Sequence, residues 1–168
     1  MLASGVTAVD LTSHPIMAGS LVMHAILADP PPVGAMRIDF RSIDPAYRNQ
    51  LKNCFAANVR DAAFDKIRMG LQCDEPLAVF LTPVAHTKSR FGRLTRHCIR
   101  CLDDRAIPLA GQNFMIGAVD AELETTTHVQ DLPTSHSPWA SQSAALVELL
   151  VSIAAQSSSA AHLQRFEG

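Results

Sequence analysis

The chain has 168 residues, of which 48% are hydrophobic and 18% charged, so it can form one domain or two small ones with a true core. This composition excludes intrinsic disorder, and a formal net charge of −2 gives no overall basic balance, so we expect no nucleic-acid partner. No apolar run approaches the roughly 20 residues of a membrane span, and the first residues lack a basic, apolar leader. We therefore expect no membrane partner, no signal peptide and a cytoplasmic location.

In chain order, the first predicted element is a short buried helix over residues 19–28, which the run Asp-Pro-Pro-Pro ends. Residues 36–40 then alternate between apolar and charged side chains, as a strand with one buried face does. Further strands are predicted at 52–60, 64–72 and 77–85. Together these segments indicate an antiparallel meander that follows a helix.

The second half begins with a basic stretch, and residues 109–130 are predicted to hold a strand pair. Ser137 followed by Pro138 is typical of a helix start, with serine as N-cap and proline at the first position. The helix that follows should extend to about residue 156. We expect three regions: a helix and strand meander at 1–86, a second half at 87–156 that completes the same domain, and a flexible tail at 157–168.

The four cysteines are expected to be free thiols, as is usual in a reducing compartment. Cys98 and Cys101 form a Cys-x-x-Cys motif beside His97, but a zinc site needs about four ligands. Cys54 and Cys73 are distant in sequence. We therefore predict no metal site and no cofactor.

The segment "HPIMAG" at residues 14–19, followed by a strand meander, resembles the hot-dog fold. MaoC-like enoyl-CoA hydratases and β-hydroxyacyl-ACP dehydratases of that fold carry a "PI-x-x-G" turn, which Pro15, Ile16 and Gly19 match over a region of about residues 10–85. The resemblance implies an α+β fold, with a hot-dog-like antiparallel sheet wrapped around a helix, plus a C-terminal helix. It also implies a homodimer that dehydrates or hydrates an acyl-CoA or acyl carrier protein thioester.

Dehydration of a hydroxyacyl thioester needs a base, an acid and donors for the thioester oxygen. In this interpretation His14 is the base, Asp10 its partner, and the amides of Gly19 and Ser20 stabilise the oxyanion. The substrate-binding residues would be His24, lining the acyl tunnel, and Arg90, Arg93 and Arg96, holding phosphates.

Simpler interpretations compete for each residue. His14 can cap a turn, His24 can be a hydrogen-bonded core histidine, and the arginines can form a solvated face.

Other functions are also open. One alternative is an acyl thioesterase. Another is a non-catalytic PilZ-like ligand-binding or interaction module, in which residues 52–64 form a helix after the strand "RIDF". A serine hydrolase with a nucleophile elbow is not indicated, because the sequence contains no G-x-S-x-G motif.

Overall fold

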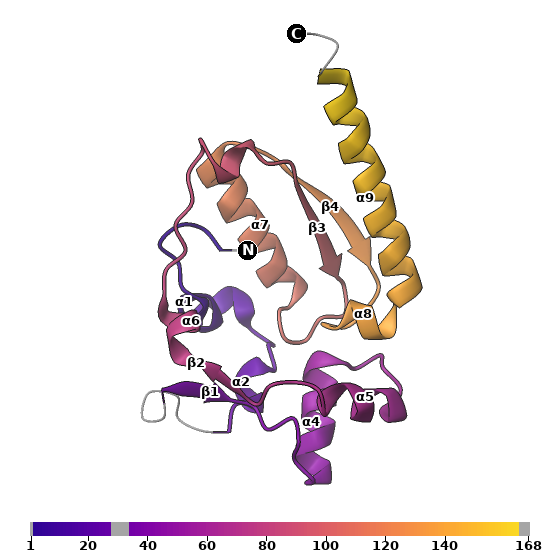
Figure 1. The fold of residues 1–168 in the computed structure, drawn as a ribbon. Helices are drawn as coiled ribbons and strands as arrows, with labels where there is room; N and C mark the ends of the chain where they lie inside the picture. Colours follow the sequence, from indigo (N-terminus) through magenta and orange to yellow (C-terminus); the bar gives the residue numbers. More distant parts are fainter. Residues whose placement is uncertain (1, 28–33, 165–168) are drawn as a thin grey trace.

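The structure is a computed structural model that describes residues 2–27 and 34–164. Its elements form two parts, one above the other in Figure 1. The upper part contains two long parallel strands between two long helices. The lower part contains short helices and a small strand pair. The two parts meet below the carboxyl ends of the parallel strands, which is where the candidate site lies.

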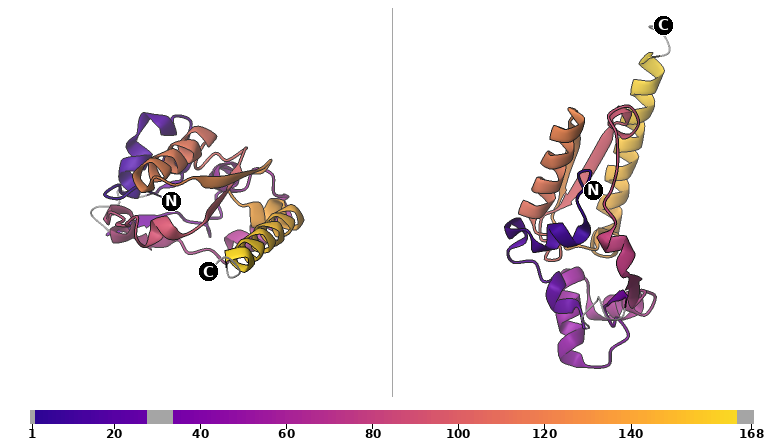
Figure 2. Two further views of the ribbon diagram at one scale, coloured as in Figure 1. Left: turned by 90° about the horizontal axis from the view of Figure 1, so that it is seen from above. Right: turned by 90° about the vertical axis from the view of Figure 1, so that its left-hand side faces the viewer.

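In the upper part, β3 (Arg96–Cys101) pairs in parallel with β4 (Thr127–Leu132), with Arg96 opposite Thr127. Parallel strands need a long crossover, and here it is helix α7 (Leu109–Leu123). Figure 2 shows α7 on one face of the pair and α9 (Ser143–Gln164) on the other. The result is a three-layer arrangement of helix, sheet and helix, with the chain order β3, α7, β4, α9.

In the described part of the chain, no helix combines the length and the hydropathy that crossing a membrane requires.

The lower part holds an antiparallel pair, β1 (Ala35–Arg37) with β2 (Asp74–Pro76), next to several helices. Helix α4 starts after Asp44, whose side chain accepts a hydrogen bond from the Ala46 amide, with proline at the first helical position. The helices of this part and of the amino-terminal segment are α1 (Ala8–Ser13), α2 (Val22–Ala25), α4 (Pro45–Phe55), α5 (Asp61–Arg68) and α6 (Leu77–Leu81), with 3₁₀ turns at Pro15–Met17 and Phe91–Arg93.

The core of the lower part forms around one face of α4. Tyr47 and Leu51 are buried one turn apart, and the Tyr47 hydroxyl donates to the Ala25 carbonyl oxygen at 2.5 Å. This bond satisfies the phenol and fixes α2 against α4. The buried cluster contains Ala25, Ile38, Tyr47, Leu51, Ala56, Val59 and Phe64.

Three of the predicted strands are wrong. Residues 52–55 end helix α4 and residues 64–68 end helix α5, each followed by turns and irregular backbone, and 77–85 begins with helix α6. Short apolar runs fit both the helical and the strand period, so they do not separate the two structures. In the structure Asp44 caps a helix that continues to Phe55 and so includes the start of the first predicted strand. The predicted helix at 19–28 is helical only over Val22–Ala25, and its last residue lies outside the described range.

The predictions for the second half are confirmed in part. Within 109–130 the first predicted strand is wrong, since that region is α7, whereas the second overlaps β4. The C-terminal helix is confirmed, although a short helix α8 (Pro138–Ser141) precedes it and Ser137 makes no side-chain cap bond. Helix α9 continues to Gln164, into the segment expected to be a tail.

The hot-dog architecture is a wrong prediction, although the mixed α+β class is correct. A hot-dog sheet is a long antiparallel meander, whereas the described residues form two separate two-stranded sheets. The longer sheet is parallel and its strands are joined through α7. Such a crossover places helices on the faces of the sheet, so the sheet cannot wrap around one helix.

Helix α7 packs closely against the first 3₁₀ turn at Gly111. A Cβ atom at this position would lie 2.5 Å from the Met17 Sδ atom, whereas a Cβ atom at Gly117 of the same helix would meet nothing within 4 Å. We expect Gly111→Ala to lower the free energy of unfolding by about 1–3 kcal/mol through overpacking. Gly117→Ala is the matched control and should raise it by up to about 1 kcal/mol through helix propensity. Urea titration measures the free energy of unfolding of both variants. Equal changes in the two variants would show that Met17 moves aside freely.

Candidate functional site: an aspartate–histidine pair

Two polar residues lie on loops that follow the two parallel strands. Asp104 comes after β3 and His136 comes after β4. Carboxyl ends of parallel strands lie at the same edge of a sheet, where open α/β sheets bind ligands. The two loops are joined directly, because the Asp103 amide donates to the Thr134 carbonyl oxygen at 3.0 Å. The fold therefore fixes the distance between Asp104 and His136.

The Asp104 side chain is 5% exposed and both of its oxygens have partners. Oδ1 accepts from the amides of Ala106 at 2.8 Å and Ile107 at 2.9 Å. Oδ2 lies 2.9 Å from Nδ1 of His136. Since an ionised carboxylate can only accept, Nδ1 of His136 is the donor in this bond. In the neutral ring, Nε2 then carries no proton and is available as a base.

The His136 ring is held in place but remains reachable. Its side chain is 36% exposed, and its ring packs against the Phe55 ring in a T-shaped arrangement with 5.7 Å between the centroids. Among the described residues, no hydrogen bond reaches Nε2 of His136. The pair has the orientation that a general base needs: one nitrogen oriented by a buried carboxylate, and the other free for chemistry.

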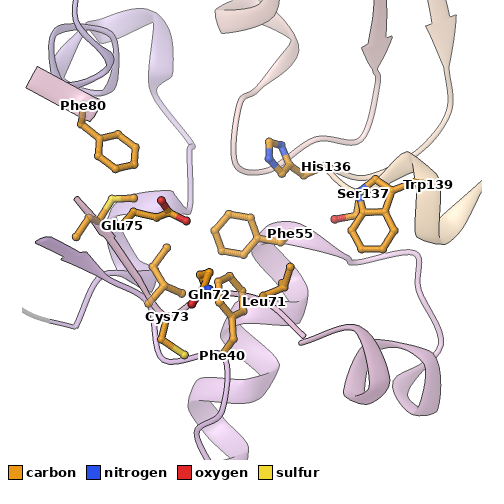
Figure 3. A pocket seen from close by; sticks show the side chains of 12 residues that line it. Phe40, Phe55, Leu71, Gln72, Cys73, Glu75, Phe80, His136, Ser137 and Trp139 are labelled. Atoms are coloured by element: carbon orange, nitrogen blue, oxygen red, sulfur yellow. The ribbon is translucent and has the colours of Figure 1, made fainter. Parts of the chain in front are cut away.

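His136 lines an apolar cavity of about 480 Å³ between the upper and lower parts. Figure 3 shows Phe55 at its centre, with Phe40 below, Phe80 on one side and Trp139 on the other. Glu75 extends into the same space from β2. The cavity is large enough for a small organic molecule placed against the histidine.

A second, smaller cavity of about 220 Å³ contains Asp104 and His136 together with Cys98 and Cys101. Burial raises the pKa of Cys98, and it raises the pKa of Cys101 to about 11, with the Asp104 charge adding to the effect. These thiols stay protonated at neutral pH and are poor nucleophiles. Within the described residues, no group of three or more histidine, cysteine or acidic side chains is arranged to hold a metal ion.

The structure gives Asp10 and His14 separate local roles. The Asp10 carboxylate accepts hydrogen bonds from Thr7 in a capping box, and these bonds lower its pKa. His14 Nδ1 accepts from the Ile16 amide at 3.1 Å, and its ring stacks on Phe114 at 4.7 Å. The hydrogen bonds of the described residues do not join Asp10 to His14. The bond from the Ile16 amide to His14 Nδ1 is the kind of contact that the alternative interpretation of His14, as the cap of a turn, expects.

Gly19, Ser20 and His24 lie on the turn and the short helix that follow. Gly19 has a φ of +87°, which explains glycine there, and the Ser20 amide is already bonded to the Met17 carbonyl oxygen. The Ser20 hydroxyl donates to the Ala106 carbonyl oxygen at 2.6 Å, so it steadies the loop that follows Asp104. The His24 side chain is exposed on α2.

The three arginines proposed to hold phosphates are not equivalent. Arg90 and Arg93 are exposed around the second 3₁₀ turn, whereas the Arg96 side chain is only 5% exposed. Arg96 Nη2 donates to Asp120 Oδ1 at 2.9 Å and to Thr125 Oγ1 at 2.7 Å. These bonds hold the Arg96 guanidinium inside the fold.

Sequence reasoning missed both Asp104 and His136. The signal was present: a polar residue follows each of two segments, 96–101 and 127–132, that flank a helix-length run. Interpreting residues 109–123 as strand hid the β-α-β unit, and with it the common edge at which these residues meet.

Comparison of the whole fold identifies its class. The chain shares its fold with part of α/β-hydrolase-like structures, and the pair described above lies at the carboxyl edge of its parallel strands. It is similar to the crystal structure of a pyrethroid hydrolase from Sphingobium faniae JZ-2, with a TM-score of 0.66, 21% identity, and coverage of 91% of this chain and 56% of that one. It is also similar to the pyrethroid hydrolase PytH with BIF, with a TM-score of 0.68, 20% identity, and coverage of 91% and 57%.

The chain thus spans somewhat more than half the length of these hydrolases. At 20–21% sequence identity, the similarity shows a shared fold and does not assign the activity of these hydrolases to this chain. No family model matches the chain, and no curated protein matches it.

The comparisons also correct the predicted activity. The hot-dog resemblance, and the lyase chemistry of a dehydratase or hydratase that it implied, are wrong, because the matched structures are hydrolases of a different fold. The hydrolytic alternative fits these neighbours better. The error arose because a short turn motif, "PI-x-x-G", specifies a local bend and not the topology around it.

Proposed function

We propose that this chain hydrolyses a carboxylic ester, with His136 as general base and Asp104 as the residue that orients it. The single observation that supports this proposal is the 2.9 Å contact between Asp104 Oδ2 and His136 Nδ1 beside an apolar cavity. A buried carboxylate holds the ring in one tautomer and stabilises the imidazolium that forms when Nε2 takes a proton.

The proposed reaction consumes one water molecule and regenerates His136. Nε2 of His136 removes a proton from water, and the water oxygen bonds to the acyl carbon of the ester. The bond from the acyl carbon to the alcohol oxygen then breaks, and the imidazolium returns its proton to the leaving alcohol. The products are a carboxylic acid and an alcohol, and His136 is again neutral.

The test is hydrolysis of a panel of nitrophenyl and alkyl esters in water labelled with heavy oxygen, with matched acyl thioesters alongside. We expect one labelled oxygen atom in the carboxylic acid and none in the alcohol, which locates the broken bond at the acyl carbon. Mass spectrometry of the protein during turnover shows whether an acyl-enzyme accumulates, which separates direct attack by water from a two-step route. Absence of turnover on every ester, with the protein folded, would contradict the proposal.

A further inference from the structure

The apolar cavity beside His136 contains one carboxylate. Glu75 lies directly opposite Met36 in the β1–β2 pair, and side chains of directly opposite residues lie on the same face of a sheet. Both Met36 and Glu75 line the cavity. The neighbouring pair, Arg37 and Asp74, points to the other face, where the two side chains form an ion pair at 2.6 Å.

The Glu75 carboxylate has no counter-charge within the described residues. No hydrogen bond or ion pair of its side chain is present there, and the residues lining the cavity include no lysine or arginine. Asp74, one residue earlier, is by contrast neutralised by Arg37, which lowers the pKa of Asp74. Glu75 is therefore the one acidic side chain among the described residues that line the cavity, where the other polar groups are Gln72, His136 and Ser137.

Aromatic rings form much of that wall. Phe40 and Phe55 lie 5.8 Å apart between centroids, and Phe80 and Trp139 face the same space from the two ends (Figure 3). The faces of aromatic rings are electron-rich and attract organic cations, and several rings combined with a carboxylate recognise quaternary ammonium groups. An anionic substrate would instead be repelled by Glu75.

We propose that this cavity binds an organic cation of the quaternary ammonium class, with Glu75 as the residue that selects the charge. This inference rests on the proposed function in one respect: if His136 hydrolyses esters, the preferred substrate is an ester of a cationic amino alcohol. The ammonium group then lies among the rings near Glu75, and the ester carbonyl faces Nε2 of His136. Binding of the cation itself does not depend on hydrolysis.

The experiment compares choline with dimethylbutanol, the uncharged carbon isostere that has the same shape. Trp139 is the sole tryptophan of the chain and lines the cavity, so its fluorescence reports occupancy of this site. We expect choline to bind about threefold to tenfold more tightly than its isostere, the range that cation–π contacts support. Equal affinities, or no binding of either compound, would overturn the proposal.

Two variants assign the effect to Glu75. Glu75→Gln, on an exposed strand, should lower the preference for choline and leave only the part that the aromatic rings supply, whereas Asp74→Asn makes the same change of charge one residue away and should leave the preference unchanged. If Asp74→Asn lowered the preference equally, a general surface potential would be responsible and the role of Glu75 would be wrong. His136→Ala should keep the preference while losing hydrolysis, so failure of the proposed function and failure of this inference give different results.

Discussion

The His136→Ala variant is expected to lose ester hydrolysis almost completely, with kcat/KM lowered by about 10²–10⁴-fold, the usual contribution of a general base. The reason is the geometry at Asp104: with Nδ1 bonded to a buried carboxylate, Nε2 is the atom of this pair that can take the proton of water. Steady-state kinetics on the best ester of the panel measures the effect. The fold should be retained, because the His136 ring is partly exposed.

Two further variants test the assignment. Asp104→Asn keeps the shape of the side chain but removes its charge, so it should lower kcat more than it changes KM, since the imidazolium loses its stabilising partner. His128→Ala removes an exposed histidine on β4 that stacks on His97, and it should leave the rate unchanged. A His136→Ala variant as active as His128→Ala would make the Asp104–His136 pair a structural contact.

Replacing Asp120 with alanine is expected to destabilise the fold by about 3–5 kcal/mol, because it leaves the buried Arg96 guanidinium without a counter-charge. Asp120 Oδ1 accepts from Arg96 Nη2 and from Thr127 Oγ1, and its Oδ2 accepts from the Thr127 amide at 3.0 Å. One carboxylate thus joins α7 to the starts of β3 and β4. Denaturant titration followed by circular dichroism measures the loss.

The double variant with Arg96→Met and Asp120→Ala separates the lost charge pair from lost packing. It should recover part of the stability that the single variant loses, because the buried charge is then gone. No difference between single and double variants would show that the guanidinium is solvated after all.

The same carboxylate makes stability depend on pH. Burial raises the pKa of Asp120, but hydrogen bonds from Thr127 and Arg96 outweigh burial and leave the pKa below its ordinary value. A carboxyl whose pKa is lowered on folding stabilises the fold above its unfolded pKa of about 3.9 and loses that contribution as pH falls through the folded value. The free energy of unfolding should therefore fall on acidification below about pH 4. Asp120→Asn should show a smaller fall than the unmodified chain.

Local signals in the sequence predicted some elements well and others poorly. The C-terminal helix was predictable because Pro138 is a strong local start signal and the apolar residues that follow recur at helical spacing. Helices α4 and α5 were not, because their runs of about ten residues fit either period and their burial depends on the neighbours. The strand at 36–40 was recognised, but only Ala35–Arg37 pairs, and its partner is nearly forty residues away.

By itself, the sequence determined the mixed α+β class, the position of the C-terminal helix and the strand alternation near residue 36. These features depend on propensity, capping and periodicity, which act between residues close in the chain. The tertiary structure alone decided that Asp104 and His136 meet, and that Glu75 faces the same cavity as Phe55. The physical reason is that a parallel strand pair aligns two loops about thirty residues apart through a crossover helix, so the polar residues after each strand are seen to meet only once the strand pairing is known.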